Sequence, residues 1–323
     1  MISIAIPTYR RPQYLAETLG RIAQELSTTD ISIEVIVQDN ASGDETKEVV
    51  TSFPDLSVSY LSNQSNLGPS ENIVRVSERC SGDYVFLLGD DDLIELGALE
   101  RVNKYSDLDQ MPGVISGPVS HFVDGESSTT RQVSFGNAQG RDYFIEPGGR
   151  SVEHLFSRAT MLSGLVIRRD LLDANGARRH SSSLYPQIYL AGIAGREAGS
   201  MYLLEPIVSV RDNPITEWSY AADYMGRGVF AILADLSAES DWARDVRKRV
   251  TKRRIRSTYG PLYAARKDSF RAYMKTVRGL SSVSEYRRSL FFWVMVLGFG
   301  SMSVRGIGLL RKVLQLSPNN SVG

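Results

Sequence analysis

Hydrophobic positions along the first ninety residues follow two alternating patterns. Over residues 10–26 the apolar side chains recur three or four positions apart, a spacing that predicts an amphipathic helix. Residues 42–53, where Ser42 and Glu45 have the spacing of a capping box, and residues 68–82 are also predicted to be helical. Short apolar runs stand between these helices and predict strands over residues 2–7, 31–40, 57–63 and 84–89.

This alternation of strand and helix predicts an α/β fold with a doubly wound, mostly parallel sheet. The run over residues 84–89 is apolar without alternation, which is typical of a strand that is covered on both faces. Ligands of such sheets bind beyond the carboxyl ends of the strands. Polar side chains stand at those ends here, so we expect a binding site formed by Thr8, Tyr9, Asp39, Asn40, Asn66 and Asp90–Asp92.

The remaining strand-like runs are longer and further apart. They cover residues 113–123 and 160–170, and a polar, glycine-containing stretch from Asp124 to Arg150 separates them. We expect that stretch to form an insertion or a hairpin over the site. A helix is predicted for residues 183–199 and a strand for residues 201–212.

The distribution of charge divides the chain into two parts. Residues 1–240 carry 19 Lys and Arg against 33 Asp and Glu, whereas residues 241–323 carry 18 against 4. The hydrophobic pattern also becomes helical from Asn213 onward. We therefore expect a catalytic α/β domain over residues 1–212 and a basic helical extension over residues 213–323. An extension with this charge favours an anionic partner, either a membrane surface or a nucleic acid.

An apolar segment at residues 290–304 favours the membrane surface over the nucleic acid as the partner. It is shorter than the roughly 20 residues that a spanning helix needs, so we expect it to lie in the membrane interface beside the basic residues. A buried helix of the extension is the alternative. Binding of nucleic acid by Tyr259, Tyr263 and Tyr273, which are interleaved with arginines, is less favoured because the apolar segment adjoins them.

Other features of the sequence indicate a cytoplasmic protein. Cys80 is the single cysteine, so an internal disulfide is excluded. No basic and then apolar leader pattern precedes the first predicted strand. The three histidines, His121, His154 and His180, lack the spacing of zinc ligands.

The three adjacent aspartates Asp90–Asp92 require a physical explanation, because neighbouring carboxylates resist ionisation. A divalent cation such as Mn²⁺ or Mg²⁺ would remove the repulsion, since both prefer oxygen ligands and complete their shells with water and phosphates. The alternative is that one aspartate caps a helix that begins near Ile94.

Four segments carry a resemblance to a known family. SIAIPTYRRPQYL, VQDNASGDET, NLGPSEN and DYVFLLGDDDLI occur in the order and spacing of family-2 glycosyltransferases with the GT-A fold. The match covers residues 1–99 and extends more loosely to residue 212 through MLSGLVIRRDLLDANGA. The variants LLGDDD and YPQIYLAGIAG resemble the branch of O-antigen and surface-polysaccharide transferases that includes abequosyltransferase-like proteins.

The resemblance implies roles for individual residues. Asp91 would hold the metal with Asp92 as a helper, and Asp39 would accept a hydrogen bond from the nucleotide base. Alternatively, Asn72 faces solvent and Gly68 only permits a turn. The residues that would bind the nucleotide sugar are Pro7, Thr8, Tyr9, Arg11, Asp39, Asn66, Gly68, Asn72 and Asp90.

The sequence departs from the family pattern in two places. Gly89 stands where the family often has an aspartate, and the stretch Tyr185–Gln187 stands where inverting members usually carry a Glu-Asp pair that supplies the general base. The base candidates that remain are His180, Asp124 and Asp212.

The resemblance implies a metal-dependent, inverting transferase that moves a sugar from a nucleotide-diphosphate sugar to an acceptor hydroxyl. The acceptor would be a lipid-linked or surface-polysaccharide glycan, and the enzyme would be peripheral to the inner face of the cell membrane. The alternative is a non-catalytic nucleotide-sugar-binding or assembly protein that lacks the general base.

Overall fold

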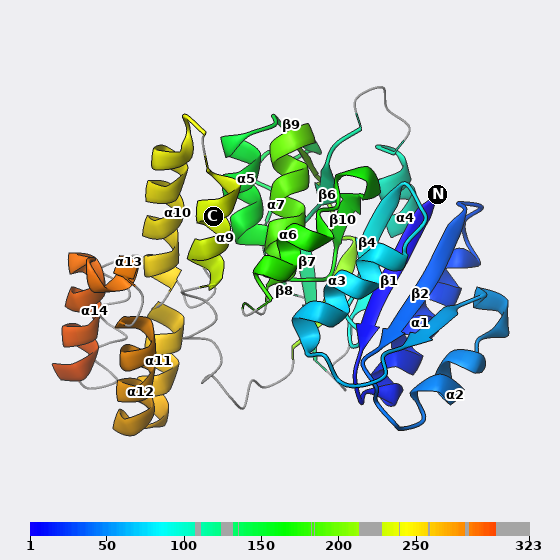
Figure 1. Cartoon of the computed structure of the whole chain (residues 1–323), viewed down its shortest axis with the longest axis horizontal. Coiled ribbons are helices and arrows are strands. Elements are labelled where there is room, and N and C mark those ends of the chain that lie inside the picture. Colours follow the sequence, from blue (N-terminus) through cyan, green and yellow to red (C-terminus); the bar gives the residue numbers. More distant parts are fainter. Residues whose placement is uncertain are drawn as a thin grey trace. The chain divides into compact units, whose positions relative to one another are not determined.

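Two compact units make up the chain, Met1–Asn213 and Pro214–Gly323, and each is described by itself (Figure 1). The computed structural model describes residues 1–106, 111–123, 132–134, 136–181, 183, 185–212, 228–238, 240–257, 259–281 and 284–301.

The first half of the first unit is a parallel α/β layer, as the hydrophobic pattern predicts. Its strands lie in the order β3-β2-β1-β4 and pair in parallel. They are β1 (Ile2–Thr8), β2 (Ile33–Asp39), β3 (Ser59–Ser62) and β4 (Tyr84–Leu87). The connections contain α1 (Pro12–Leu26), α2 (Thr46–Thr51), the 3-10 turn η1 (Pro54–Leu56) and α3 (Pro69–Arg79).

The sheet continues beyond β4 with mixed strand directions. Antiparallel β10 joins β4 to β6, β11 runs parallel to β6, and antiparallel β9 forms the edge. These strands are β10 (Leu165–Arg168), β6 (Val114–Ser116), β11 (Ser200–Tyr202) and β9 (Tyr143–Ile145). The mostly parallel α/β sheet expected from the sequence is therefore confirmed, with β10 and β9 as its antiparallel members.

A second sheet has the order β5-β12-β7-β8. It consists of β5 (Leu93–Ile94), β12 (Val208–Arg211), β7 (Val119–Phe122) and β8 (Gln132–Ser134). Two runs that were each expected to form one strand divide between the sheets, β6 from β7 at Pro118 and β11 from β12 at Pro206. Proline lacks the amide hydrogen that a central strand needs for pairing, so each run breaks there.

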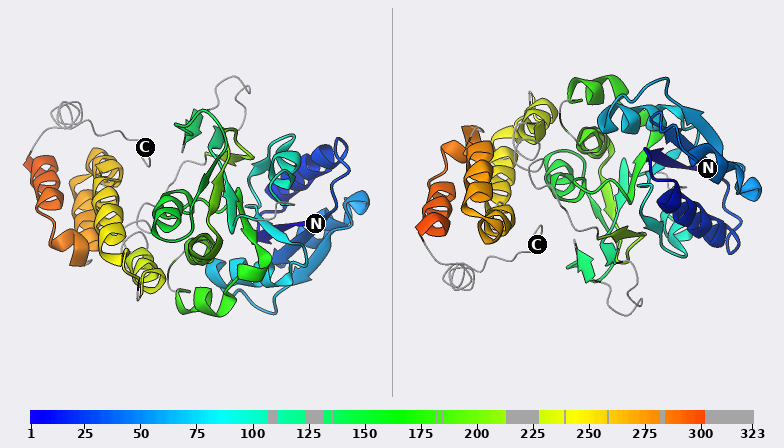
Figure 2. Two further views of the ribbon diagram at one scale, coloured as in Figure 1. Left: turned by 90° about the horizontal axis from the view of Figure 1, so that it is seen from above. Right: turned by 90° about the horizontal axis from the view of Figure 1, so that it is seen from below.

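Helices α5 (Gly149–Arg158) and α7 (Pro186–Ala198) pack against each other, and Figure 2 shows them end-on beside the strands. Gly195 permits this close approach, because a Cβ atom at this position would stand 2.4 Å from Leu155 Cδ1. The 3-10 turn η3 (Arg169–Leu171) and helix α6 (Ala174–Arg179) connect β10 to α7.

Two capping expectations are corrected by the structure. Helix α2 begins at Thr46 rather than at the expected capping box, because the Ser42 hydroxyl donates to Asp39 instead. Helix α4 (Ala98–Asn103) begins after a short strand rather than near Ile94, and the buried Glu25 carboxylate accepts hydrogen bonds from its first-turn amides. Capping of a helix therefore does not explain the three aspartates.

The second unit is helical and basic, as expected. Its described helices are α9 (Val229–Leu236), α10 (Ala243–Ser257), α11 (Tyr259–Asp268), α12 (Phe270–Ser281), α13 (Ser284–Arg287) and α14 (Leu290–Ser301). Within the described ranges, no helix has both the length and the apolar character needed to cross a membrane. The apolar segment forms α14 up to Ser301, and residues 302–304 lie outside the described residues.

A buried arginine joins three segments in the second half of the first unit. Arg158, at the end of α5, is 1% exposed and donates to the carbonyl oxygens of Gly117 and Ser163, each at 2.8 Å. Burial lowers the pKa of its guanidinium to about 10. These bonds fix the segments that enter β7 and β10.

Replacing Arg158 with leucine is expected to lower the free energy of unfolding by about 3 kcal/mol, because the buried carbonyl oxygens lose their donor. Urea denaturation followed by circular dichroism measures this change. Arg150→Leu on the exposed face of the same helix is the matched control and should change stability by less than about 0.5 kcal/mol. Equal stability of the two variants would contradict the role given to Arg158.

Candidate active site

The candidate site begins where the carboxyl ends of β1, β2 and β4 meet. Strand register places Thr8 opposite Asp39, and β1 pairs with β4 through Ala5 and Leu87. Continuing that register by three residues brings Thr8 level with Asp90, and the Thr8 hydroxyl donates to Asp90 Oδ2 at 2.7 Å. The expected convergence of polar residues at this edge therefore occurs for these three residues.

The three aspartates differ in their surroundings. Asp90 has an 8% exposed side chain and accepts from Thr8 and Arg11. Asp92 is 7% exposed, and its two oxygens accept from the Ser163 hydroxyl and, at 3.0 Å, from the backbone amide of Arg211. Asp91 has the most exposed side chain of the three, at 20%, and its Oδ2 accepts from Arg11 at 2.7 Å. Asp91 is therefore the carboxylate that a ligand can reach most readily.

The turn that carries the aspartates is fixed from α1. The hydroxyl of Thr18, which is fully buried, donates to the carbonyl oxygens of Asp90 and Asp92 at 3.0 and 2.9 Å. Ser163, just before β10, also accepts from the Gly89 amide at 2.8 Å. The backbone of the turn is thus held from both sides, and its geometry does not depend on the carboxylates alone.

Burial perturbs the ionisation of this cluster. It raises the pKa of Asp90 to about 6, against the bond from Thr8 and the charge of Arg11, which lower it. Burial, with the charge of Asp91, also raises the pKa of Asp92 to about 6. Burial lowers the pKa of the Arg11 guanidinium. Attraction to Asp90 and Asp91 has the larger combined effect, so the pKa is raised.

The donor set fits a divalent cation only if a substrate completes the shell. Within the described residues, no group of three or more His, Cys, Asp or Glu side chains is arranged to hold a metal. Magnesium-type sites often take one or two carboxylates and fill the remaining positions with phosphate oxygens and water. Asp91 meets that requirement. Asp92 as a second ligand stays a prediction, because its oxygens already accept from Ser163 and Arg211.

Asp39 occupies a buried, fully polar environment at the end of β2. Its Oδ1 accepts from the backbone amide of Ser42 at 3.1 Å, and its Oδ2 accepts from the Tyr60 hydroxyl at 2.7 Å. Burial and these contacts with Asp39 raise the pKa of Tyr60 to about 12. Recognition of a nucleotide base by Asp39 stays a prediction.

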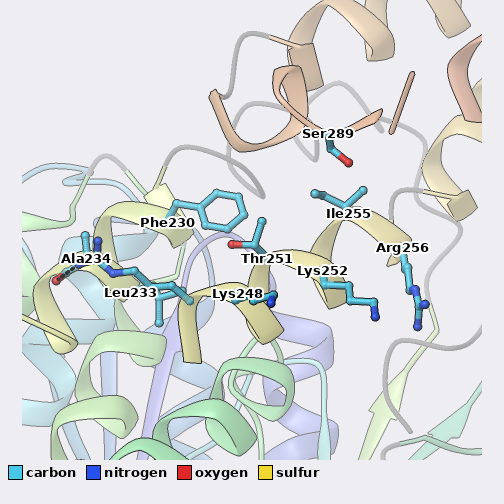
Figure 3. A pocket seen from close by; sticks show the side chains of 10 residues that line it. Phe230, Leu233, Ala234, Lys248, Thr251, Lys252, Ile255, Arg256 and Ser289 are labelled. Carbon is cyan, nitrogen blue, oxygen red and sulfur yellow. Dashed lines mark hydrogen bonds between the residues drawn. The ribbon is translucent and has the colours of Figure 1, made fainter. Parts of the chain in front are cut away.

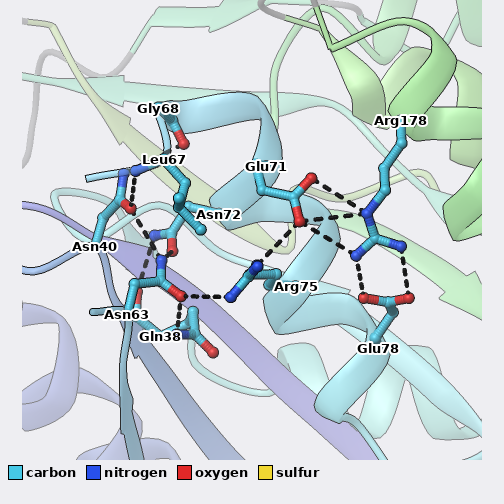
Figure 4. Close-up of polar contacts among 10 residues, drawn as sticks. All are labelled: Gln38, Asn40, Asn63, Leu67, Gly68, Glu71, Asn72, Arg75, Glu78 and Arg178. Atoms are coloured by element: carbon cyan, nitrogen blue, oxygen red, sulfur yellow. Dashed lines mark hydrogen bonds and ion pairs between the residues drawn. The ribbon is translucent and has the colours of Figure 1, made fainter. Parts of the chain in front are cut away.

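A network of asparagine side chains orders the loops beside Asp39 (Figure 4). Asn63 donates to Asn40 and Asn72, each at 2.9 Å. Asn72 is 2% exposed and donates to the carbonyl oxygen of Gln38 at 2.9 Å, so the alternative that it faces solvent is wrong. Asn40 in turn donates to Asn66 at 2.9 Å. The network fixes the loop that leads into α3.

Gly68 ends that loop with a backbone φ of +82°, a conformation that residues other than glycine rarely adopt. The conformation of the loop therefore explains why a glycine stands at this position.

The neighbouring helix α3 is tied to α6 by ion pairs that Figure 4 also shows. Arg178 donates to Glu78 at 2.9 Å and to Glu71 at 3.2 Å. The hydrogen bond to Glu78 is the main cause of the raised pKa of Arg178.

The loop after β1 presents the remaining expected donor-site residues. Pro7 and Tyr9 are partly exposed, and Arg10 adopts a φ of 54° with its guanidinium 5.1 Å from the centre of the Tyr9 ring. Arg11 is 47% exposed at its side chain and reaches the aspartates. Contacts of these residues with a nucleotide stay predictions.

The expected base candidates on the acceptor side are dispersed. His180 is 9% exposed at the end of α6, and its ring packs 5.2 Å from that of Tyr189. Asp124 lies outside the described residues. Gln187, in the first turn of α7, is 3% exposed, and its Oε1 has no hydrogen-bond partner in the described part of the chain.

Asp212 forms a constellation that sequence reasoning missed. Its Oδ1 lies 2.8 Å from His121 Nδ1, and His121 Nε2 lies 2.7 Å from the Ser134 hydroxyl oxygen. With Asp212 accepting from Nδ1, the Nε2 atom of His121 carries the lone pair and accepts from Ser134. These residues are 91 and 13 positions apart, and pairing of β12 with β7 and of β7 with β8 brings them together.

This constellation lies next to the aspartate turn along the backbone. Arg211, which precedes Asp212, donates from its amide to Asp92 and from Nε to the carbonyl oxygen of Asp91 at 3.1 Å. The guanidinium of Arg211 also lies 4.7 Å from the Phe122 ring, beside His121. One residue therefore links the aspartate turn to the histidine.

Comparison with known proteins agrees with this geometry. A family model described as Glycosyl transferase family 2 matches residues 3–163. A segment of 113 residues is 34% identical to the abequosyltransferase RfbV of Salmonella typhimurium and covers 33% of each protein. A segment of 104 residues is 36% identical to the GalNAc(5)-diNAcBac-PP-undecaprenol beta-1,3-glucosyltransferase of Campylobacter jejuni, with 31% of this chain and 33% of the relative covered. The matches thus span about a third of the length of these relatives.

Comparison of structures establishes the fold. A crystal structure of S. aureus TarS 1–349 in complex with UDP-GlcNAc has a TM-score of 0.65 to this chain at 13% sequence identity. The superposition covers 97% of this chain and 91% of that chain. The expected GT-A architecture is confirmed.

The raised pKa of Asp92 predicts how stability depends on pH. In the folded protein Asp92 keeps its proton up to about pH 6, whereas in the unfolded chain it loses the proton near pH 4. This carboxyl therefore destabilises the fold increasingly as pH rises through that window. Asp92→Asn removes the effect. The stability advantage of Asp92→Asn over the parent, measured as the difference between their free energies of unfolding in urea titrations, should therefore grow by about 3 kcal/mol from pH 4 to pH 7.

Asp55→Asn is the matched control because Asp55 is exposed, and its difference from the parent should stay flat across the same range. A flat difference for Asp92→Asn would contradict the raised pKa.

Proposed function

Since residues 3–163 belong to family 2 of the glycosyltransferases, we propose that the chain transfers a sugar from a nucleotide-diphosphate sugar to an acceptor hydroxyl. The observation that carries the proposal is the row of Asp39, Thr8 and Asp90 at the sheet edge, with Asp91 accessible beside it. A nucleotide placed along this edge has its base near Asp39 and its diphosphate near Asp91.

In this proposal different groups bind the two parts of the donor, its nucleoside and its diphosphate. Pro7, Tyr9 and the ordered loop at Asn66 and Gly68 line the nucleoside, and Arg11 attracts the diphosphate. Asp91 would hold a divalent Mn²⁺ or Mg²⁺ ion, which would supply positive charge to the diphosphate leaving group. Arg11 then balances the charge of Asp90, to which it already donates at 3.3 Å.

The acceptor hydroxyl loses its proton to His121 in this proposal. The imidazole is oriented by Asp212 at 2.8 Å, which leaves Nε2 to accept a proton, and the Ser134 hydroxyl occupies the position that the acceptor hydroxyl would take. A base on the face opposite the departing diphosphate gives inversion at the anomeric carbon. Asp212, one of the expected candidates, thus acts through His121 rather than directly.

The acceptor we propose is a lipid-linked or surface glycan at the inner face of the cell membrane. The name of one relative contains a glycan on PP-undecaprenol, and another relative is named an abequosyltransferase. The second unit adds a basic surface and exposed apolar side chains, namely Phe270, Val294 and Leu297 at 56%, 53% and 69% exposure. These features support attachment to an anionic membrane surface.

Replacing Asp91 with asparagine tests the donor half of the proposal. Turnover at saturating donor should fall by about a hundredfold or more, and its dependence on Mn²⁺ concentration should shift to much higher values, because the metal loses its accessible carboxylate. A screen of nucleotide sugars by thermal shift with and without Mn²⁺ first identifies the donor. Asp55→Asn is the control and should behave as the parent. Equal, near-zero product release by parent and Asp91→Asn would favour the alternative, a non-catalytic binding protein.

Replacing His121 with glutamine tests the acceptor half. The variant should lose about 10²-fold or more in kcat while its Kd for the nucleoside diphosphate stays within twofold of the parent value. Asp212→Asn should lower kcat at least about tenfold, because the imidazole loses its orienting partner. His180→Gln is the matched control and should keep kcat within threefold of the parent. A loss in His180→Gln with normal turnover in His121→Gln would assign the base to His180.

A further inference from the structure

A cavity in the second unit is lined by residues that have no role in the proposed transfer reaction. It has a volume of about 590 Å³ and lies between α9, α10 and Ser289, just before α14 (Figure 3). This volume is within the range of small-molecule sites in proteins. All of its lining residues belong to the second unit, so the cavity is complete without residues 1–213.

The interior of the cavity is apolar. Phe230 and Leu233 from α9 and Ile255 from α10 line it, and these side chains are 9%, 1% and 5% exposed. A hydrocarbon chain that entered would replace water on these surfaces and gain roughly 0.8 kcal/mol for each buried methylene group. A sugar or a nucleotide, which carries polar groups on all sides, would not gain in this way.

The rim of the cavity is cationic. Lys248, Lys252 and Arg256 follow one another at intervals of four residues along α10 and are exposed, and Figure 3 shows them in a row beside the apolar side chains. Residues at this spacing lie on one face of a helix. Among the residues that the structure describes, no acidic side chain lines the cavity, and α10 as a whole contains eight Lys or Arg against a single Asp.

A fourth cation among the lining residues, Arg247, is fixed in place by hydrogen bonds. Arg247 donates from Nε to the Ser237 hydroxyl at 2.9 Å and from Nη2 to the carbonyl oxygen of Ala234 at 3.1 Å. These bonds link α10 to the end of α9. The separation of the two helices, and with it the width of the cavity, is therefore set by the protein itself.

We propose that this cavity binds an anionic membrane lipid, with one hydrocarbon chain against Phe230, Leu233 and Ile255 and the phosphate group against the row of Lys248, Lys252 and Arg256. Charge complementarity selects the phosphate, and the apolar interior selects the chain. The occupant is a lipid because only an amphiphile satisfies both surfaces. This inference concerns the second unit alone, and its test needs no sugar donor, so its failure is distinguishable from failure of the proposed transferase activity.

The first test uses dodecyl phosphate, below its micelle-forming concentration, with the full chain in isothermal titration calorimetry. We expect saturable binding at least about tenfold tighter than that of inorganic phosphate or of dodecyl maltoside, which each carry half of the recognised chemistry. Equal binding of inorganic phosphate would reduce the cavity to an anion site and overturn the proposal. Equal binding of the maltoside, or no binding of dodecyl phosphate, would also overturn the proposal.

The second test separates the cavity from the general positive charge. Replacing Lys248, Lys252 and Arg256 together with glutamine should weaken dodecyl phosphate binding at least about tenfold. The control replaces Arg271, Lys275 and Arg278, which are exposed on α12 and outside the cavity, and should leave that binding within twofold. Equal effects of the two triple variants would overturn the assignment.

The third test keeps every charge and fills the cavity. Thr251→Trp places a large ring among the lining side chains and should weaken both dodecyl phosphate binding and sedimentation with phosphatidylglycerol vesicles at least about fivefold. Ala234→Trp does the same from α9 and serves if the first variant unfolds, which a thermal melt detects. Vesicles of phosphatidylcholine should bind weakly throughout. Parent-like binding of phosphatidylglycerol vesicles by a folded, filled variant would overturn the lipid as the occupant.

Discussion

The burial of Asp90 and Asp92 is the constraint on which the first unit depends. Two carboxylates with little access to water must be compensated by hydrogen bonds. The bonds come from four separate parts of the chain: Thr8 at the end of β1, Ser163 before β10, Arg211 in β12 and Arg11 before α1. Each bond ties another part of the chain to the same turn. The aspartate turn is therefore the point at which the two sheets and both halves of the larger sheet are joined.

This arrangement also explains why the third carboxylate, that of Asp91, is accessible to a ligand. Asp91 is flanked by two carboxyl groups whose pKa values are raised by burial. Its backbone carbonyl oxygen accepts from the buried Arg211, and its side chain accepts from the half-exposed Arg11. Arg11 is the half-exposed counter-charge, whereas Arg211 is buried. The same cluster thus combines a fixed frame with one accessible carboxylate.

The sequence was sufficient to predict that Thr8, Asp39 and Asp90 meet at one sheet edge, and insufficient to predict the cluster around His121, for a physical reason. Thr8, Asp39 and Asp90 follow strands whose pairing in parallel is implied by the alternation of strand and helix, so their meeting could be predicted. The meeting of His121, Ser134 and Asp212 depends on a second sheet whose strands begin after Pro118 and Pro206, and no local pattern specifies which strand pairs with which. The capping role of Glu25 was hidden for a similar reason, since its partners are more than seventy residues away.

The division of two runs between the sheets has a consequence for how such an enzyme can diverge. The chain passes from the larger sheet to the smaller one at three places, the aspartate turn between β4 and β5 and the short connections at Pro118 and Pro206. His121 and Asp212 belong to the smaller sheet and its end, whereas Asp39 belongs to the larger sheet. Insertions in the segment between β7 and β8 alter the surroundings of the histidine without shifting the register of β1, β2 and β4. Substitutions around His121 and Asp212 can therefore accumulate without disturbing the strand pairs that bring Thr8, Asp39 and Asp90 together.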